Sequence, residues 1–264
     1  MTVRFDRIQA CFRESARRQY EAVPLPPFTL FFHPTDALVY MNYAIPDVPD
    51  PENVAPMIPE LRRIFARRGR VARFELVEEH SPRLGGELAA CGFRLEPRGC
   101  LMVAAASEVC EPPRVPGLSI SCLRAGARDE DVAASVSVFR EAFGMEPVDA
   151  IGPAEIASQR HFVENGTTIF VGAIDGQAVG LSCLQPAYRR VAEIAGVGTR
   201  VAFRRRGIGA ALTYAAAAHA LEGGVDTLVL GAGTLEAGRV YGSCGFRAVG
   251  STVGWIDSGA GDPE

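Results

Sequence analysis

The hexapeptide Arg204-Arg205-Arg206-Gly207-Ile208-Gly209 is the stretch that decides the fold of this chain. A strand-like segment at 190–199 precedes it, and an unbroken helix-forming segment at 208–221 follows it. A glycine-rich turn that opens a helix leaves the first backbone N–H groups unpaired, and the helix dipole adds positive potential there. The two glycines also remove side chains that would block a ligand from the backbone. The hexapeptide therefore predicts a binding site for a phosphate or pyrophosphate group.

Two other phosphate-binding loops do not fit the sequence. A P-loop requires Gly-x-x-x-x-Gly-Lys-Ser/Thr, and the 264 residues include no lysine. A dinucleotide fingerprint requires Gly-x-Gly-x-x-Gly, and Leu212 stands where its third glycine belongs. The pattern that remains is Arg-x-x-Gly-x-Gly between a strand and a helix.

A second landmark lies at residues 237–246, where Tyr241 stands four residues before the pair Gly245-Phe246. The apolar segment 227–230 between the two landmarks indicates a short buried strand. In this order the landmarks resemble the GCN5-related N-acetyltransferases, the GNAT family, whose cofactor loop is Gln/Arg-x-x-Gly-x-Gly/Ala. The resemblance covers roughly residues 118–256. Upstream, the sequence predicts a strand, a helix and a hairpin, at 118–124, at 129–143, and at 167–174 with 178–184.

The N-terminal half repeats part of this pattern. Cys91-Gly92-Phe93-Arg94 recurs 153 residues later as Cys244-Gly245-Phe246-Arg247, and 75–77 then aligns with 228–230. Such self-similarity indicates two copies of one fold. We therefore predict an α/β (α+β) protein of two tandem GNAT-like domains, each a mostly antiparallel twisted sheet flanked by helices. The predicted boundaries are 1–110 and 118–264, joined by a proline-containing linker at 111–117. In the first copy, 28–33 and 37–45 indicate the matching hairpin and 56–68 the matching helix.

The N-terminal copy lacks both the glycine loop and the tyrosine of the C-terminal copy. Its segment 46–53 has no glycine, no arginine and several acids, so it would repel a pyrophosphate. Leu88 stands at the position of Tyr241. We expect this domain to keep the fold without the cofactor loop. An unrelated N-terminal domain with a chance Cys-Gly-Phe-Arg match stays open as the alternative.

The resemblance implies acetyl-CoA as co-substrate and no metal. The pyrophosphate is expected on the loop amides and the pantetheine alongside the strand at 190–199, which tends to separate from the following strand. Gly196 and Gly198 suit such a distorted strand end. The expected cofactor-binding residues are Val197, Gly198, Thr199, Arg204, Arg205, Arg206, Gly207, Ile208, Gly209, Ala210 and Thr234.

For catalysis the resemblance implies that Tyr241 protonates the departing thiolate as a general acid. Glu193 is the candidate base, because strand alternation predicts that it shares a face with Ala195 and Val197. Glu146 and Asp149 are alternatives that would attract a cationic acceptor, and a solvent-exposed structural role stays open for all three acids. The predicted function is acetyl-CoA-dependent N-acetyltransfer to a primary amine by direct attack in a ternary complex. A non-catalytic acyl-CoA-binding or sensory module is the alternative.

Composition limits the partners and the compartment. The net charge of −4 makes nucleic acid an unsuitable partner, and no apolar run reaches membrane-spanning length. The first twenty residues are too charged for a signal peptide. The seven cysteines form no Cys-x-x-Cys pair, which is typical of thiols in a reducing compartment. We expect a cytoplasmic protein acting on a small-molecule or peptide amine, with homo-oligomerisation left open.

Overall fold

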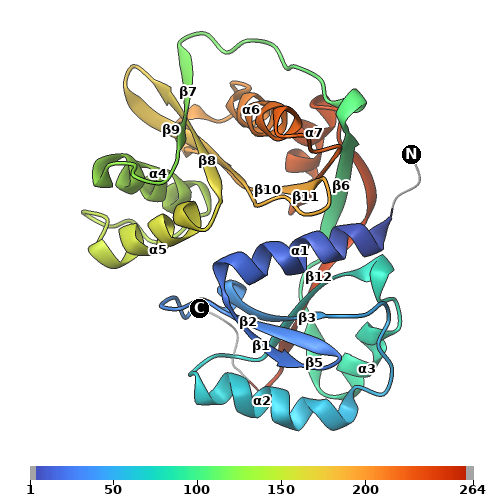
Figure 1. Ribbon diagram of the computed structural model, residues 1–264. Coiled ribbons are helices and arrows are strands. Elements are labelled where there is room, and N and C mark those ends of the chain that lie inside the picture. The colour runs from blue at the N-terminus through green and yellow to red at the C-terminus, as the bar shows by residue number, and fades with distance from the viewer. Residues whose placement is uncertain (1–3, 260–264) are drawn as a thin grey trace. The chain divides into compact units, whose positions relative to one another are not determined.

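The computed structural model describes residues 4–259, which form two compact units (Figure 1). Unit 1 comprises residues 4–101 and 249–259, and unit 2 is Met102–Ala248. The chain passes from unit 1 to unit 2 within strand β6 (Gly99–Ala105) and returns within strand β12 (Arg247–Asp257). Both boundaries between the units therefore fall within a strand. The sequence instead predicted one boundary, at the linker 111–117, and one continuous C-terminal domain.

Unit 2 is built on a mostly antiparallel sheet. Its strands β7 to β10 pair in chain order, each antiparallel to the next, and β11 then runs parallel to β10. Strand β6 lies on the other side of β11. The strand bounds are Leu118–Leu123 for β7, Thr168–Ile174 for β8, Gln177–Leu184 for β9, Val191–Thr199 for β10 and Thr227–Ala232 for β11. The β8–β9 hairpin turns at Asp175 and Gly176, both with positive φ, as its sequence predicts.

Helices cover both faces of the unit 2 sheet. Helices α4 (Asp129–Ala142) and α5 (Pro153–Glu164) lie on one face, and α6 (Ile208–Glu222) lies on the other (Figure 1). Alternation along β9 explains this arrangement, because Leu181 packs with α4 while a Cβ at Gly180 would lie 2.8 Å from Leu212 of α6. Helix α7 (Leu235–Ser243) follows β11.

Unit 1 has the strand order β1-β2-β3-β4-β12, with β5 also paired to β12. Its elements are α1 (Phe5–Gln19), β1 (Glu21–Leu25), β2 (Phe28–Phe32), β3 (Asn42–Pro46), α2 (Ile58–Arg67), β4 (Arg73–Val77), α3 (Leu84–Ala90) and β5 (Phe93–Leu95). Strand β2 is buried on both faces. Phe28 and Phe32 pack in the core that α2 and α3 cover, whereas Phe31 packs against Ala16 of α1. Helices α1 and α2 accordingly lie on opposite sides of this sheet (Figure 1).

One predicted strand of unit 1 is shorter than expected. Instead of running over 37–45, the chain forms a 3₁₀ turn at Val39–Met41, and β3 begins at Asn42. The Asn42 side chain donates to the carbonyls of Asp36 (3.0 Å) and Leu38 (2.8 Å), and the His33 imidazole accepts the Asp36 N–H (2.8 Å). These local side-chain bonds replace strand pairing in the first part of the segment.

The two units are copies that exchange their last strands. A shift of 153 residues places β4 on β11, α3 on α7 and β6 on β12. Yet β4 pairs with β12, from Thr252–Val77 to Ile256–Arg73, and β11 lies beside β6. Val253 of β12 is 2% exposed in the core of unit 1. Each unit therefore completes its sheet with the last strand of the other repeat.

Candidate cofactor-binding and catalytic site

The parallel strands β10 and β11 separate partway along their length. Val191, Ala192 and Glu193 pair with Thr227, Leu228 and Val229, and no further pair joins the two strands within residues 4–259. Strand β10 continues to Thr199 and β11 to Ala232. The result is the strand separation that the GNAT resemblance implies.

A β-bulge at Gly196 changes the direction of the side chains in β10. Gly196 has φ +59°, and the pairing with β9 shifts between Ala195–Cys183 and Gly198–Leu181. Because Cys183 and Leu181 share a face of β9, Ala195 and Gly198 share a face of β10. The expectation that Val197 continues the face of Glu193 and Ala195 was therefore wrong, since the bulge inserts one residue into the alternation.

The end of α4 lies directly against the separated part of β10. A Cβ at Gly198 would be 2.7 Å from Ala142 Cβ and 3.2 Å from Phe143 Cε2. Phe143 stacks on Phe139 with ring centroids 4.6 Å apart and stays half exposed. Gly198 is thus required for close packing, in addition to its predicted place beside the cofactor.

The predicted phosphate loop opens α6 with free backbone donors. Gly207 caps the helix with φ +82°, a conformation that favours glycine. The first helical hydrogen bond runs from the Ala211 N–H to the Gly207 carbonyl at 3.0 Å. The N–H groups of Ile208, Gly209 and Ala210 therefore precede the helical ladder, at the positive end of the helix dipole.

The three arginines of the loop differ in their contacts. Arg204 donates to the carbonyls of Thr199 (3.2 Å) and Ala142 (3.0 Å), so it braces the loop against β10 and α4. Arg206 donates to the Ala202 carbonyl at 3.3 Å and lies over the Phe203 ring. Arg205 is exposed and has φ +66°. In this structure Arg204 therefore supports the loop through its two hydrogen bonds to backbone carbonyls.

Two supporting residues were missed by the sequence prediction. Arg200 forms an ion pair with Glu141 of α4 and donates to the Ala178 carbonyl at 2.8 Å. The other carboxylate oxygen of Glu141 accepts the Val201 N–H at 3.1 Å. The pair anchors the turn between β10 and the loop. Its members are 59 residues apart, and neither belongs to a recognisable motif.

The end of β10, the start of α6 and helix α7 come together at Gly209. A Cβ there would lie 3.7 Å from Val240 Cγ1 and 3.9 Å from Thr199 Oγ1. The buried Cys244 thiol donates to the Ala210 carbonyl at 3.5 Å, which ties the end of α7 to the same helix start. Thr234 has a capping role, because its hydroxyl oxygen accepts the Ala237 N–H at the start of α7 (3.1 Å).

Tyr241 and Glu193 have different surroundings. Tyr241 is 7% exposed in α7, and burial, assisted by the nearby Cys244, raises the pKa of its hydroxyl to about 12. Glu193 is partly buried at the last pair between β10 and β11, and its carbonyl accepts the Gln185 N–H at 2.8 Å. The alternatives Glu146 and Asp149 are exposed in the loop between α4 and α5.

The separated strand pair and the glycine loop at a helix start define a GNAT fold, present here in tandem. Residues 134–246 match the family described as "Acetyltransferase (GNAT) family". A GCN5-related N-acetyltransferase from Kribbella flavida has the same fold over 98% of both chains, at 24% identity and a TM-score of 0.80. The family match therefore covers residues 134–246, and the Kribbella flavida structure shows that the fold is shared.

Other solved structures share the fold at lower identity. A "Tandem GNAT protein from the clavulanic acid biosynthesis pathway" is 16% identical over 87% of this chain and 77% of its own, with a TM-score of 0.65. A GCN5-related N-acetyltransferase from Sphaerobacter thermophilus is 17% identical over 96% and 90%, with a TM-score of 0.63. No curated protein matches the sequence significantly.

Three further features concern metals, membranes and thiols. Residues 4–259 contain no group of three or more His, Cys, Asp or Glu side chains placed to hold a metal ion. In the same residues no helix combines the length and apolar character that a bilayer crossing requires. All seven cysteines are free thiols.

Proposed function

We propose that unit 2 is an acetyl-CoA-dependent N-acetyltransferase that moves an acetyl group to a primary amine of a small molecule or peptide. The observation that carries the proposal is the gap in pairing beyond Glu193 and Val229. The gap borders β10, whose last residue is Thr199. Thr199 lies close to the free amides at the start of α6 and to helix α7, which contains Tyr241.

The loop fits a pyrophosphate. The N–H groups of Ile208, Gly209 and Ala210 precede the helical ladder, and neither Gly207 nor Gly209 places a Cβ in front of them. Arg205 and Arg206 are exposed beside these donors and would add positive charge. Val197, Gly198 and Thr199 would offer backbone groups to the pantetheine along the separated part of β10.

Bound acetyl-CoA would supply an activated thioester. An alkylamine has a pKa of about 10.4, so it must lose a proton before it can attack the thioester carbonyl. Glu193 would accept this proton, directly or through water. As the carbon–sulfur bond breaks, Tyr241 would donate its hydroxyl proton to the departing sulfur. The burial that raises the pKa of Tyr241 also disfavours a thiolate beside it, so both effects keep the proton available until the bond breaks.

Titration calorimetry with acetyl-CoA, followed by coenzyme A release with a panel of primary amines, tests the proposal. We expect saturable binding with one site per chain and release that depends on the amine. Absence of saturable binding would exclude the cofactor assignment. Binding without release for every amine would favour the acyl-CoA-binding module instead.

A further inference from the structure

In unit 1 a carboxylate occupies the place of the phosphate loop. Glu87 of α3 accepts the N–H groups of Asn53 (3.0 Å) and Val54 (2.7 Å). These residues align with Arg206 and Gly207 of the unit 2 loop, and they directly precede a 3₁₀ turn, Ala55–Met57, that continues into α2. The carboxylate therefore lies at a helix start, where unpaired N–H groups favour negative charge.

The corresponding position in unit 2 holds an apolar side chain. The shift of 153 residues places Ala55 on Ile208, the first residue of α6, and Glu87 on Val240. Val240 Cγ1 would lie 3.7 Å from a Cβ at Gly209. The same position on the following helix thus faces the helix start in both units, with a carboxylate in unit 1 and a methyl group in unit 2.

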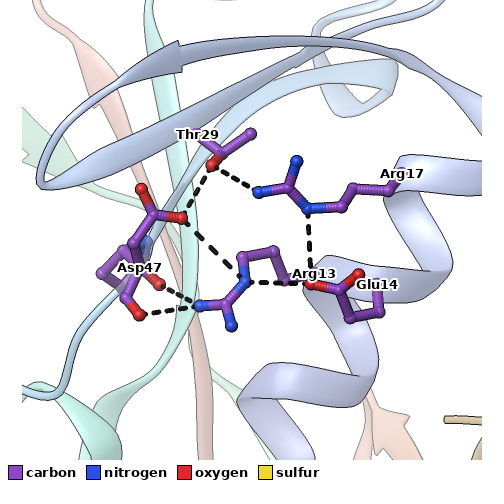
Figure 2. A network of polar contacts seen from close by, with 6 residues as sticks. Arg13, Glu14, Arg17, Thr29 and Asp47 are labelled. Carbon is purple, nitrogen blue, oxygen red and sulfur yellow. Dashed lines mark hydrogen bonds and ion pairs between the residues drawn. The ribbon is translucent and has the colours of Figure 1, made fainter.

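Other charged side chains of unit 1 contact the remainder of the segment 46–53, which follows β3. The Arg83 N–H donates to Asp50 Oδ1 at 2.8 Å, and the two side chains form an ion pair. Asp47 directly follows β3, and its carboxylate accepts the Thr29 hydroxyl at 2.7 Å (Figure 2). Its backbone carbonyl accepts from Arg13 at 2.9 Å, and Arg17 donates to Thr29 at 3.1 Å. The loop that follows β3 is therefore held by contacts within the protein.

We propose that the residue at position 87 or 240 decides whether the helix start can bind the pyrophosphate of coenzyme A. Glu87 is a built-in anion that closes the site in unit 1, and Val240 keeps the site in unit 2 open. This inference rests on the proposed function of unit 2. It predicts one coenzyme A site per chain, because the Glu87 carboxylate pairs with the N–H groups of Asn53 and Val54 and would repel a second anion at the same helix start.

Val240→Glu tests the inference, with Val240→Gln as a neutral control of equal length. Titration with coenzyme A is expected to show binding at least about 100-fold weaker than wild type for V240E, from the repulsion of two adjacent anions. The glutamine variant should lose about tenfold or less. Binding by V240E within threefold of wild type would overturn the inference, and so would an equal loss in both variants, because shape and not charge would then be responsible.

A second measurement does not depend on the cofactor. Glu87→Val removes the acceptor of two N–H groups, so we expect a lower unfolding temperature than in wild type, with Glu87→Gln in between. An unchanged unfolding temperature for E87V would overturn the role of Glu87 as an internal anion, even if V240E fails to fold. If wild type itself binds no coenzyme A, the proposed function fails, and the E87V result still decides whether Glu87 acts as this anion.

Discussion

Glu193 of β10 and Val229 of β11 form the last pair that joins these parallel strands, and their position sets where the gap begins. Beyond this pair β10 stays in place because β9 holds its other edge through Gly198–Leu181 and Thr199–Gly180. The Arg204 side chain donates to the Thr199 carbonyl and so holds the end of β10. The separated part of β10 is thus fixed on one side, and the proposed pantetheine site lies along its other edge.

The first prediction concerns the hydroxyl of Tyr241. Tyr241→Phe should keep acetyl-CoA affinity within about threefold and lower turnover by about 10²–10⁴-fold, the usual contribution of a general acid. Calorimetry and coenzyme A release measure the two quantities. Tyr188→Phe is the matched control and should turn over like wild type, because Tyr188 precedes β10 and pairs with Val191, at the end of the strand away from Thr199. Unchanged turnover in Y241F would remove the general-acid role.

A second prediction follows from the raised pKa of Tyr241. Its pKa is about 12 in the folded chain against 10.0 for an ordinary tyrosine, so the neutral hydroxyl favours the folded state. This stabilisation is complete below pH 10 and is lost as the pH rises through 12, by about 2–3 kcal/mol in total. Urea unfolding of wild type and Y241F between pH 8 and pH 12 should therefore show a steeper loss in wild type. Parallel curves would contradict the prediction.

The third prediction concerns Gly207, which caps α6 with φ +82°. Gly207→Ala should lower the free energy of unfolding by about 1 kcal/mol or more, because alanine is strained at positive φ. The new Cβ would also lie 3.3 Å from Val115 Cγ2. Acetyl-CoA affinity should fall as the loop shifts.

Gly242→Ala in α7 is the control for this substitution. A Cβ at Gly242 meets no atom within 4 Å, so the change should be neutral or stabilising by up to about 1 kcal/mol. Equal stability of G207A and wild type in chemical denaturation would show that the loop tolerates a side chain.

The fourth prediction tests the strand exchange. Val253→Asp places an unpaired carboxylate in the core of unit 1, which should cost about 3 kcal/mol or more. Hydrogen exchange should reveal lost protection in β2, β3 and β4, although Val253 lies far along the chain from them. Ala248→Asp, at an exposed position of the same strand, should change little. Loss of protection in β9 and β10 with β2 to β4 intact would contradict the exchange.

Local sequence was sufficient for the elements that carry the site. The glycine loop, the helix after it and the β8–β9 hairpin depend on backbone conformations that glycine and its neighbours set within a few residues, and all three have the predicted bounds within two residues. The two copies were also visible, because the shared Cys-Gly-Phe-Arg segment keeps one spacing without a gap. The predicted face of Val197 was wrong, because the bulge in β10 depends on how β10 pairs with β9 and not on the sequence of β10 alone.

What the sequence by itself determined is therefore the class of fold, the glycine loop that opens α6 and the difference between Tyr241 and Leu88. Tertiary structure alone decided that the last strands are exchanged, since β6 and β12 are equally strand-like and only pairing selects their neighbours. It alone also placed Glu87 on the amides of Asn53 and Val54, 33 to 34 residues away. Such contacts join residues that are distant in the chain, so no local pattern of residues contains them.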